Sequence, residues 1–124
     1  MQADLNLAKQ RLKLKDLALV IAKNGKVLFE TELHGISGLL NAIEQHKKTM
    51  QGSSVADKIL GRAAALLFAY SGVVAAFAVT ASSGGIQVLK DHKIFLEYEK
   101  RVPSILNYEK IDVCPFEKLT ANIL

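Results

Sequence analysis

Two stretches rich in serine and glycine contain the residue types best suited to bind a small ligand. Gly52-Ser53-Ser54 precedes a long helical pattern, and Ser82-Ser83-Gly84-Gly85 follows an apolar run of strand character. Backbone N–H groups and the helix dipole at such helix starts favour phosphate or carboxylate groups. The stretches therefore indicate an anion site, although serine caps and glycine turns are also common without ligands. No G-x-G-x-x-G or G-x-x-x-x-G-K-[ST] motif strengthens the indication.

Charged side chains gather beside the first stretch. Ser54-x-x-Asp57 has the spacing of a capping box, and Lys58 and Arg62 lie four residues apart, on one face of a helix. A solvated surface is the commoner meaning of such a pair. Two cations near a helix N-terminus oppose the helix dipole, however, and a bound anion would offset that cost.

Cys114 is the only cysteine, and it precedes Pro115 at a predicted helix start. The helix dipole would favour its thiolate, whereas Glu117 would oppose it. A Cys114-dependent enzyme of nucleophilic or redox chemistry is one hypothesis, and a structural cysteine at a helix cap is the other. A single cysteine forms no intrachain disulfide, and the three histidines have no H-E-x-x-H spacing, so we expect no metal and no other cofactor.

Length, composition and charge narrow the class of protein. The 124 residues, half of them apolar, predict one domain (1–124) with one core. The start of the sequence has no signal-peptide pattern, which with the low cysteine content predicts a cytoplasmic protein. The formal charge of +4 comes from the N-terminal region. Its cations indicate a solvated helix face and argue against nucleic acid, because no aromatic residues or nucleic-acid motif accompany them. These cations are Lys9, Arg11, Lys13 and Lys15.

The uncharged run Ala63–Ala81 has the length of a membrane span but not its pattern. It is rich in alanine, and Ser71-Gly72 interrupts it. Helical spacing begins upstream, near residue 54, and Gly72 can end that helix. The run therefore predicts the end of one helix, a turn and a buried strand, and no membrane partner.

Hydrophobic periodicity places the remaining elements and predicts an α/β fold. Asn24-Gly25 favours a type I′ hairpin, whose first strand is apolar on both faces and whose second should lie near a sheet edge. The result is a three-layer α/β/α domain with a mixed sheet of four to five strands and parallel crossovers. The other expected elements are an amphipathic helix in 1–13 capped by Asp4, a helix from Ser37, a helix over 86–92, a strand over 94–99, and a C-terminal loop and helix within 101–124.

This order of elements resembles a family of small uncharacterised prokaryotic proteins with a cytidine-deaminase-like fold. The resemblance covers most of residues 14–120 and is carried by SSVADKILGRAAALL, VVAAFAVTASSGGIQVL, VPSILN and CPFEKL. Active deaminases place a His or Cys before Ala-Glu at the start of the helix after the hairpin, and Pro-Cys-x-x-Cys at the next helix, to hold zinc. The matching positions, Val55-Ala56-Asp57 and residues 82–86, lack every ligand, so the resemblance implies that zinc-dependent deamination is absent.

The resemblance also implies that the two helix starts meet in a polar recess. We expect this recess to bind a small anionic ligand such as a nucleotide. Its expected ligand-binding residues are Ser54, Asp57, Lys58, Ser82, Ser83 and Gly84. Two alternatives stay open: the Cys114-dependent enzyme, and a structural or homo-oligomerising module that uses an exposed sheet edge.

Overall fold

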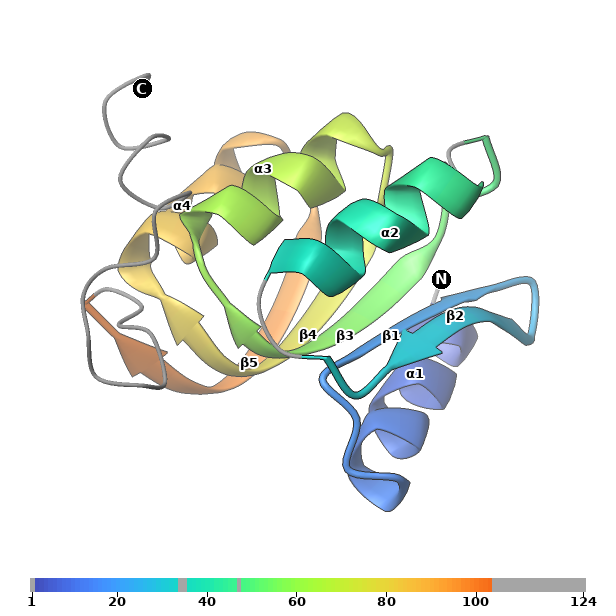
Figure 1. Ribbon diagram of the computed structural model, residues 1–124. Helices are drawn as coiled ribbons and strands as arrows, with labels where there is room; N and C mark the ends of the chain where they lie inside the picture. Colours follow the sequence, from blue (N-terminus) through green and yellow to red (C-terminus); the bar gives the residue numbers. More distant parts are fainter. Residues whose placement is uncertain (1, 34–35, 47, 104–124) are drawn as a thin grey trace.

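The computed structural model describes residues 2–33, 36–46 and 48–103 and shows an α/β fold (Figure 1). The described elements, in chain order, are α1 (Gln2–Leu14), β1 (Leu19–Lys23), β2 (Lys26–Thr31), α2 (Ile36–His46), β3 (Ser54–Leu60), α3 (Arg62–Tyr70), β4 (Ala75–Ser82), α4 (Ser83–Asp91) and β5 (Phe95–Val102). The predicted C-terminal helix lies outside the described residues.

One mixed sheet joins the five strands in the order β2-β1-β3-β4-β5. β1 is antiparallel to both β2 and β3, whereas β3, β4 and β5 are parallel. The hairpin prediction is confirmed: Asn24 and Gly25 both have positive φ, 54° and 79°, as a type I′ turn requires. The apolar strand β1 is internal and the mixed strand β2 is at an edge, also as predicted.

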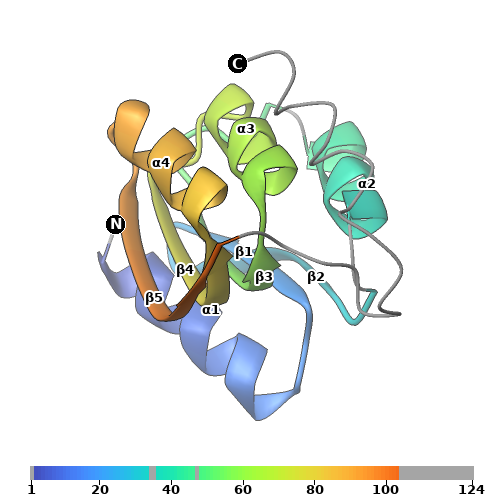
Figure 2. The ribbon, with the colours of Figure 1, turned by 90° about the vertical axis from the view of Figure 1, so that its left-hand side faces the viewer.

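The sheet carries helices on both faces, which confirms the three-layer α/β/α prediction (Figure 2). On one face, α2, α3 and α4 pack on strand residues that include Ile21 and Val55. On the other, Leu5 of α1 packs on a second set that includes Val20 and Phe77. Successive strand residues point to opposite faces, so strands apolar at every position supply both cores.

The expected helix from residue 54 is wrong in its first half. Residues 54–60 form the central strand β3, and α3 begins only at Arg62. Val55 and Ile59, four residues apart, fit a helix face as well as a strand, and Ser54-x-x-Asp57 imitates a cap. The β-branched residues favour a strand once β1 and β4 pair with them on either side.

The uncharged run Ala63–Ala81 is confirmed as a helix, a turn and a strand. It holds most of α3, then Gly72 with φ 80°, then most of β4. Within the described ranges, no helix combines the length and apolarity that crossing a membrane demands. The lack of charged residues in Ala63–Ala81 is therefore explained by burial, since Phe68 and Phe77 are almost completely covered.

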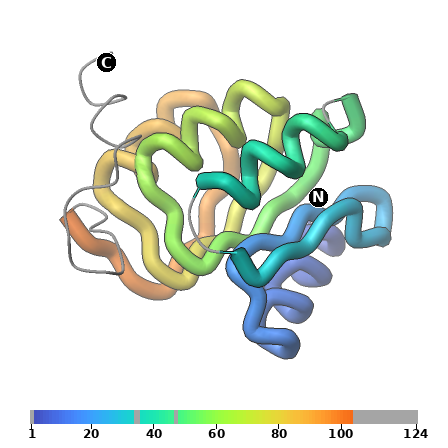
Figure 3. Tube along the Cα trace, viewed as in Figure 1, coloured from blue at the N-terminus to red at the C-terminus, as the bar shows by residue number. Residues whose placement is uncertain are grey.

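The cations of α1 contact carboxylates of the protein itself. Lys9 Nζ lies 2.6 Å from Glu97 Oε2, Lys13 pairs with Glu99, and Arg11 Nε donates to Glu30 Oε1 at 2.8 Å. The hydrogen bond from Arg11 holds the pKa of Glu30 below its ordinary value. These pairs link α1 to β2 and to β5, and Figure 3 shows α1 on the side of the sheet opposite α2, α3 and α4. Most of the predicted cationic face is thus engaged within the fold.

Candidate ligand site at the carboxyl edge of the sheet

The carboxyl ends of β3, β4 and β5 lie along one side of the sheet, which we call the carboxyl edge. β3 ends at Leu60 and β4 at Ser82, and α3 and α4 start directly after them. α2 also starts on this side: a Cβ added to Gly38, in its first turn, would lie 3.0 Å from Thr31 Cγ2 at the end of β2. Ligands of open α/β sheets bind outside the carboxyl ends of strands, so this edge is the candidate site.

The starts of α3 and α4 touch through two glycines. A Cβ placed on Gly85 would lie 3.0 Å from the carbonyl oxygen of Gly61 and 3.1 Å from that of Leu60. Only a residue without a side chain allows the first turn of α4 to approach the β3–α3 turn this closely. The two positive helix ends are thereby held side by side.

Ser82 is a structural cap of α4. It is fully buried, and its Oγ accepts a hydrogen bond of 2.9 Å from the N–H of Gly85. By contrast Gly61, the N-cap of α3, provides no side-chain cap. The sequence had assigned the Ser82 hydroxyl to ligand binding. In the structure, this hydroxyl caps α4.

Replacing Ser82 with alanine should lower the free energy of unfolding by about 1 kcal/mol, because loss of an N-cap typically costs that amount. Urea unfolding would measure it. Ser82→Thr keeps a hydroxyl oxygen and serves as the control. A Ser82→Ala variant as stable as the parent would contradict the capping role.

Arg101 brings positive charge to the same helix start. Its Nε donates to Ser83 Oγ at 3.1 Å, and the Ser83 hydroxyl donates to the carbonyl oxygen of Val102 at 3.4 Å. Arg101 is exposed at the end of β5, and Arg62 is the partly buried first residue of α3. Arg101 thus places one guanidinium group at the start of α4, and Arg62 is the residue at which α3 begins.

Asp57 supplies the titratable group of this region. It pairs in register with Leu19 and Ala78, and Ala78 belongs to the core beneath α2, α3 and α4, so Asp57 lies on that face. Its carboxyl is only partly exposed, and its Oδ1 accepts one bond of 3.3 Å from the N–H of Ile59. Desolvation raises the pKa of Asp57 to about 8, against the smaller opposing effect of backbone hydrogen bonds from Ile59 and Lys58. At pH 7 this carboxyl is mostly neutral.

The structure does not gather the six predicted ligand residues in one place. Ser54 pairs with Ala75 at the opposite edge of the sheet. Ser82 lies seven residues after Ala75 along β4, which places it roughly 23 Å from Ala75 at about 3.3 Å per residue. Lys58 faces the α1 side, where its Nζ lies 2.8 Å from Asp16 Oδ1. Asp57, Ser83 and Gly84 remain on or next to the carboxyl edge.

Sequence reasoning missed Gly61, Arg62 as a helix start, and Arg101. The glycine that directly follows the apolar pair Ile59-Leu60 was the available signal for Gly61. The approach of Arg101 to Ser83 joins residues 18 positions apart and had no local signal. Cys114 and His34 lie outside the described residues, so the Cys114 hypothesis stays a prediction, as do the homo-oligomer and the cytoplasmic location.

The position assigned to the zinc motifs also needs correction. The helix after the hairpin is α2, and the next is α3. The first motif therefore corresponds to His34-Gly35-Ile36 in the sequence, where the His is present and the Glu is replaced by Ile, rather than to Val55-Ala56-Asp57. The second motif corresponds to Gly61-Arg62-Ala63-Ala64 rather than to residues 82–86. That stretch contains no cysteine, and the one cysteine of the sequence, Cys114, is 50 positions further along the sequence than Ala64. Within the part of the chain that the structure describes, no group of three His, Cys, Asp or Glu side chains could hold a metal ion.

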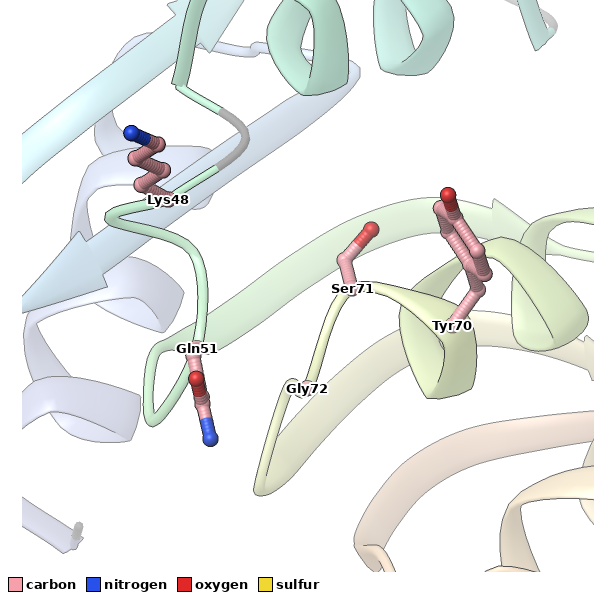
Figure 4. A pocket seen from close by; sticks show the side chains of 5 residues that line it. All are labelled: Lys48, Gln51, Tyr70, Ser71 and Gly72. Atoms are coloured by element: carbon pink, nitrogen blue, oxygen red, sulfur yellow. The ribbon is translucent and has the colours of Figure 1, made fainter.

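A shallow pocket lies at the opposite edge, between the loop after α2 and the end of α3. Its lining residues are Lys48, Gln51, Tyr70, Ser71 and Gly72. Figure 4 shows that the Lys48, Gln51 and Tyr70 side chains extend away from one another. The pocket adjoins a helix C-terminus, where the dipole is negative, so it suits an anion less well than the carboxyl edge does.

Comparisons with known proteins support the fold. A family model described as TM1506, domain of unknown function (DUF1893), matches residues 7–123. The crystal structure of a DUF1893 family protein from Thermotoga maritima superposes with a TM-score of 0.87 at 24% identity, over 99% of this chain and 82% of that one. A search among curated proteins finds no match.

Two further solved structures share the fold at lower similarity. Acinetobacter baumannii RibD matches with a TM-score of 0.61 and 16% identity, over 79% of this chain and 35% of RibD. The dCMP deaminase of cyanophage S-TIM5, in complex with dCMP and dUMP, matches with a TM-score of 0.57 and 15% identity, over 78% and 94%. The resemblance to deaminase-like folds is thus confirmed as a likeness of architecture.

Proposed function

The chain belongs to the DUF1893 family, a domain of unknown function, and we propose that it binds a small anionic ligand of the nucleotide class at the carboxyl edge, without zinc. The observation that carries this proposal is the contact of the α3 and α4 starts at Gly61 and Gly85. The positive ends of two helix dipoles adjoin there, which favours a phosphate group.

The two arginines strengthen the proposal. Arg62 and Arg101 belong to the two touching helix starts, and Arg101 is oriented by Ser83. A guanidinium group presents several donors in a plane that matches phosphate oxygens.

Asp57 is compatible with an anionic ligand because its carboxyl is mostly protonated at neutral pH. A neutral carboxyl does not repel phosphate, and it can donate a hydrogen bond as well as accept one. Polar atoms of a base or sugar would be suitable partners for it. An ionised carboxylate at the same place would work against binding.

The choice of the nucleotide class rests on the fold neighbours. The cyanophage enzyme holds dCMP and dUMP in a related architecture, and open α/β sheets bind ligands at the edge described above. The identity is only 15%, so the likeness makes nucleotides the first class to test. The absence of zinc is supported by the sequence, which has no Pro-Cys-x-x-Cys at the start of α3.

Thermal shift against nucleoside monophosphates, sugar phosphates and inorganic phosphate tests the proposal. A ligand present at 100 times its dissociation constant adds about 2.7 kcal/mol to stability. Arg101→Gln should weaken binding, whereas Lys90→Gln, which removes the same charge from the far end of α4, should not. If no compound stabilises the protein, or if the two variants behave alike, the proposed site is wrong.

A further inference from the structure

The β1–β2 turn contains an Asn-Gly pair, a dipeptide whose asparagine is prone to spontaneous deamidation in unstructured chains. In an Asn-Gly pair the glycine nitrogen can attack the asparagine side chain, because glycine has no side chain to hinder the approach. Asn24 is exposed, and no atom outside the turn lies within 4 Å of a Cβ added to Gly25. Solvent therefore reaches this pair freely.

Asp4 of α1 binds both N–H groups of the turn. Its Oδ1 accepts a hydrogen bond of 2.8 Å from Gly25, and its Oδ2 accepts one of 3.0 Å from Asn24. The sequence had suggested that Asp4 caps α1, and this expectation is wrong. Asp4 lies within the helix and is 8% exposed. A carboxylate that holds these two donors fixes the turn on the start of α1.

We propose that Asn24 is a site of spontaneous deamidation whose rate is set by the hydrogen bond from Gly25 to Asp4. The Gly25 nitrogen must lose its proton before it can attack. A carboxylate that accepts this N–H stabilises the protonated form and opposes a negative charge on the nitrogen. Asp4 therefore protects the turn for as long as α1 stays in place.

The reaction needs only base and water. Base removes the Gly25 proton and the nitrogen bonds to Asn24 Cγ. The side-chain nitrogen then takes a proton from the conjugate acid of the base, its bond to Cγ breaks, and ammonia leaves. Water then opens the resulting succinimide at either carbonyl, which gives an aspartyl or an isoaspartyl residue at position 24. Either product places a new carboxylate beside Asp4, and the isoaspartyl form also lengthens the main chain. Deamidation would therefore weaken the contact between Asp4 and the turn irreversibly, while the buried face and the ion pairs of α1 still hold the helix on the sheet.

Peptide mapping by mass spectrometry after incubation in mildly alkaline buffer measures the rate. In the folded protein, Asn24 should deamidate at least roughly tenfold more slowly than in a synthetic peptide of residues 20–29, since a hydrogen bond to a charged group contributes about 1.5–3 kcal/mol. Asp4→Asn should recover most of that factor. Asn41, exposed on α2, is the internal reference and should not respond.

Leu5→Ala separates this protection from a general loosening of α1. It removes a fully buried side chain from the same helix and leaves the carboxylate in place, so it should accelerate deamidation much less than Asp4→Asn does. Amide exchange in β4 and in α1 establishes that each variant is folded with α1 in place. Equal rates in the parent and the Asp4→Asn variant, equal acceleration by Leu5→Ala, or a parent rate equal to that of the peptide would each overturn the proposal.

Discussion

Replacing Asp57 with asparagine should remove much of the pH dependence of folding stability between the ordinary carboxyl pKa of 3.8 and about 8. The pKa of Asp57 is raised in the folded state, so between these values the folded protein binds more protons than the unfolded chain. Stability then falls as pH rises, with a slope that approaches about 1.4 kcal/mol per pH unit for one whole proton. Below the lower value, this contribution no longer changes.

Urea unfolding at a series of pH values tests this expectation. The parent should lose stability steadily from mildly acidic to neutral pH, and the Asp57→Asn curve should be flatter and should lie above the parent at the alkaline end. Asp91→Asn, which changes an aspartate at the exposed end of α4, is the matched control and should leave the slope unchanged. Parallel curves for the parent and Asp57→Asn would show that Asp57 is ionised at neutral pH, and its suitability beside an anionic ligand would then be lost.

Replacing Gly85 with valine should destabilise the protein by about 1–3 kcal/mol, the usual cost of overpacking. The new Cβ would meet the backbone of Gly61 and Leu60 at 3.0–3.1 Å. Backbone atoms within a turn cannot rotate aside as a flexible side chain can, so α4 must move away from α3. The contact that carries the proposed function would open.

Gln87→Val provides the control for this substitution. It introduces the same β-branched residue into α4 at an exposed position and costs only helix propensity and the side-chain hydrogen bond to Asp91. We expect Gly85→Val to lose clearly more stability than Gln87→Val in urea unfolding, and to lose ligand stabilisation as well. Similar losses in the two variants would mean that the close approach at Gly61 is not constrained.

Local residue patterns were sufficient for much of the fold. Asn24-Gly25 defined the hairpin because few pairs adopt two positive φ values easily, and Gly72 separated α3 from β4 for the same reason. β3 was missed because Val55 and Ile59 fit two periods at once. The choice between them is made by pairing with β1 and β4, which no local pattern encodes.

The site was predictable only in part for the same reason. Ser82 and Ser83 could be identified as a helix start from their position after an apolar run. Gly61 and Gly85 are close because β3 and β4 pair in parallel in this register. Arg101 is close to Ser83 because β5 pairs in parallel with β4. Mistaking β3 for a helix moved the expected recess to Ser54, at the other end of the strand.

The most direct test is to titrate the isotope-labelled protein with dCMP and with inorganic phosphate and to measure the changes in the backbone amide chemical shifts. We expect the shift changes to concentrate at residues 61–64 and 83–85 and at Arg101. They should be small at residues 48–51 and 70–72, which line the pocket at the opposite edge. Shifts centred on that pocket, or no shift with either compound at saturating concentration, would contradict the assignment of the carboxyl edge as the ligand site.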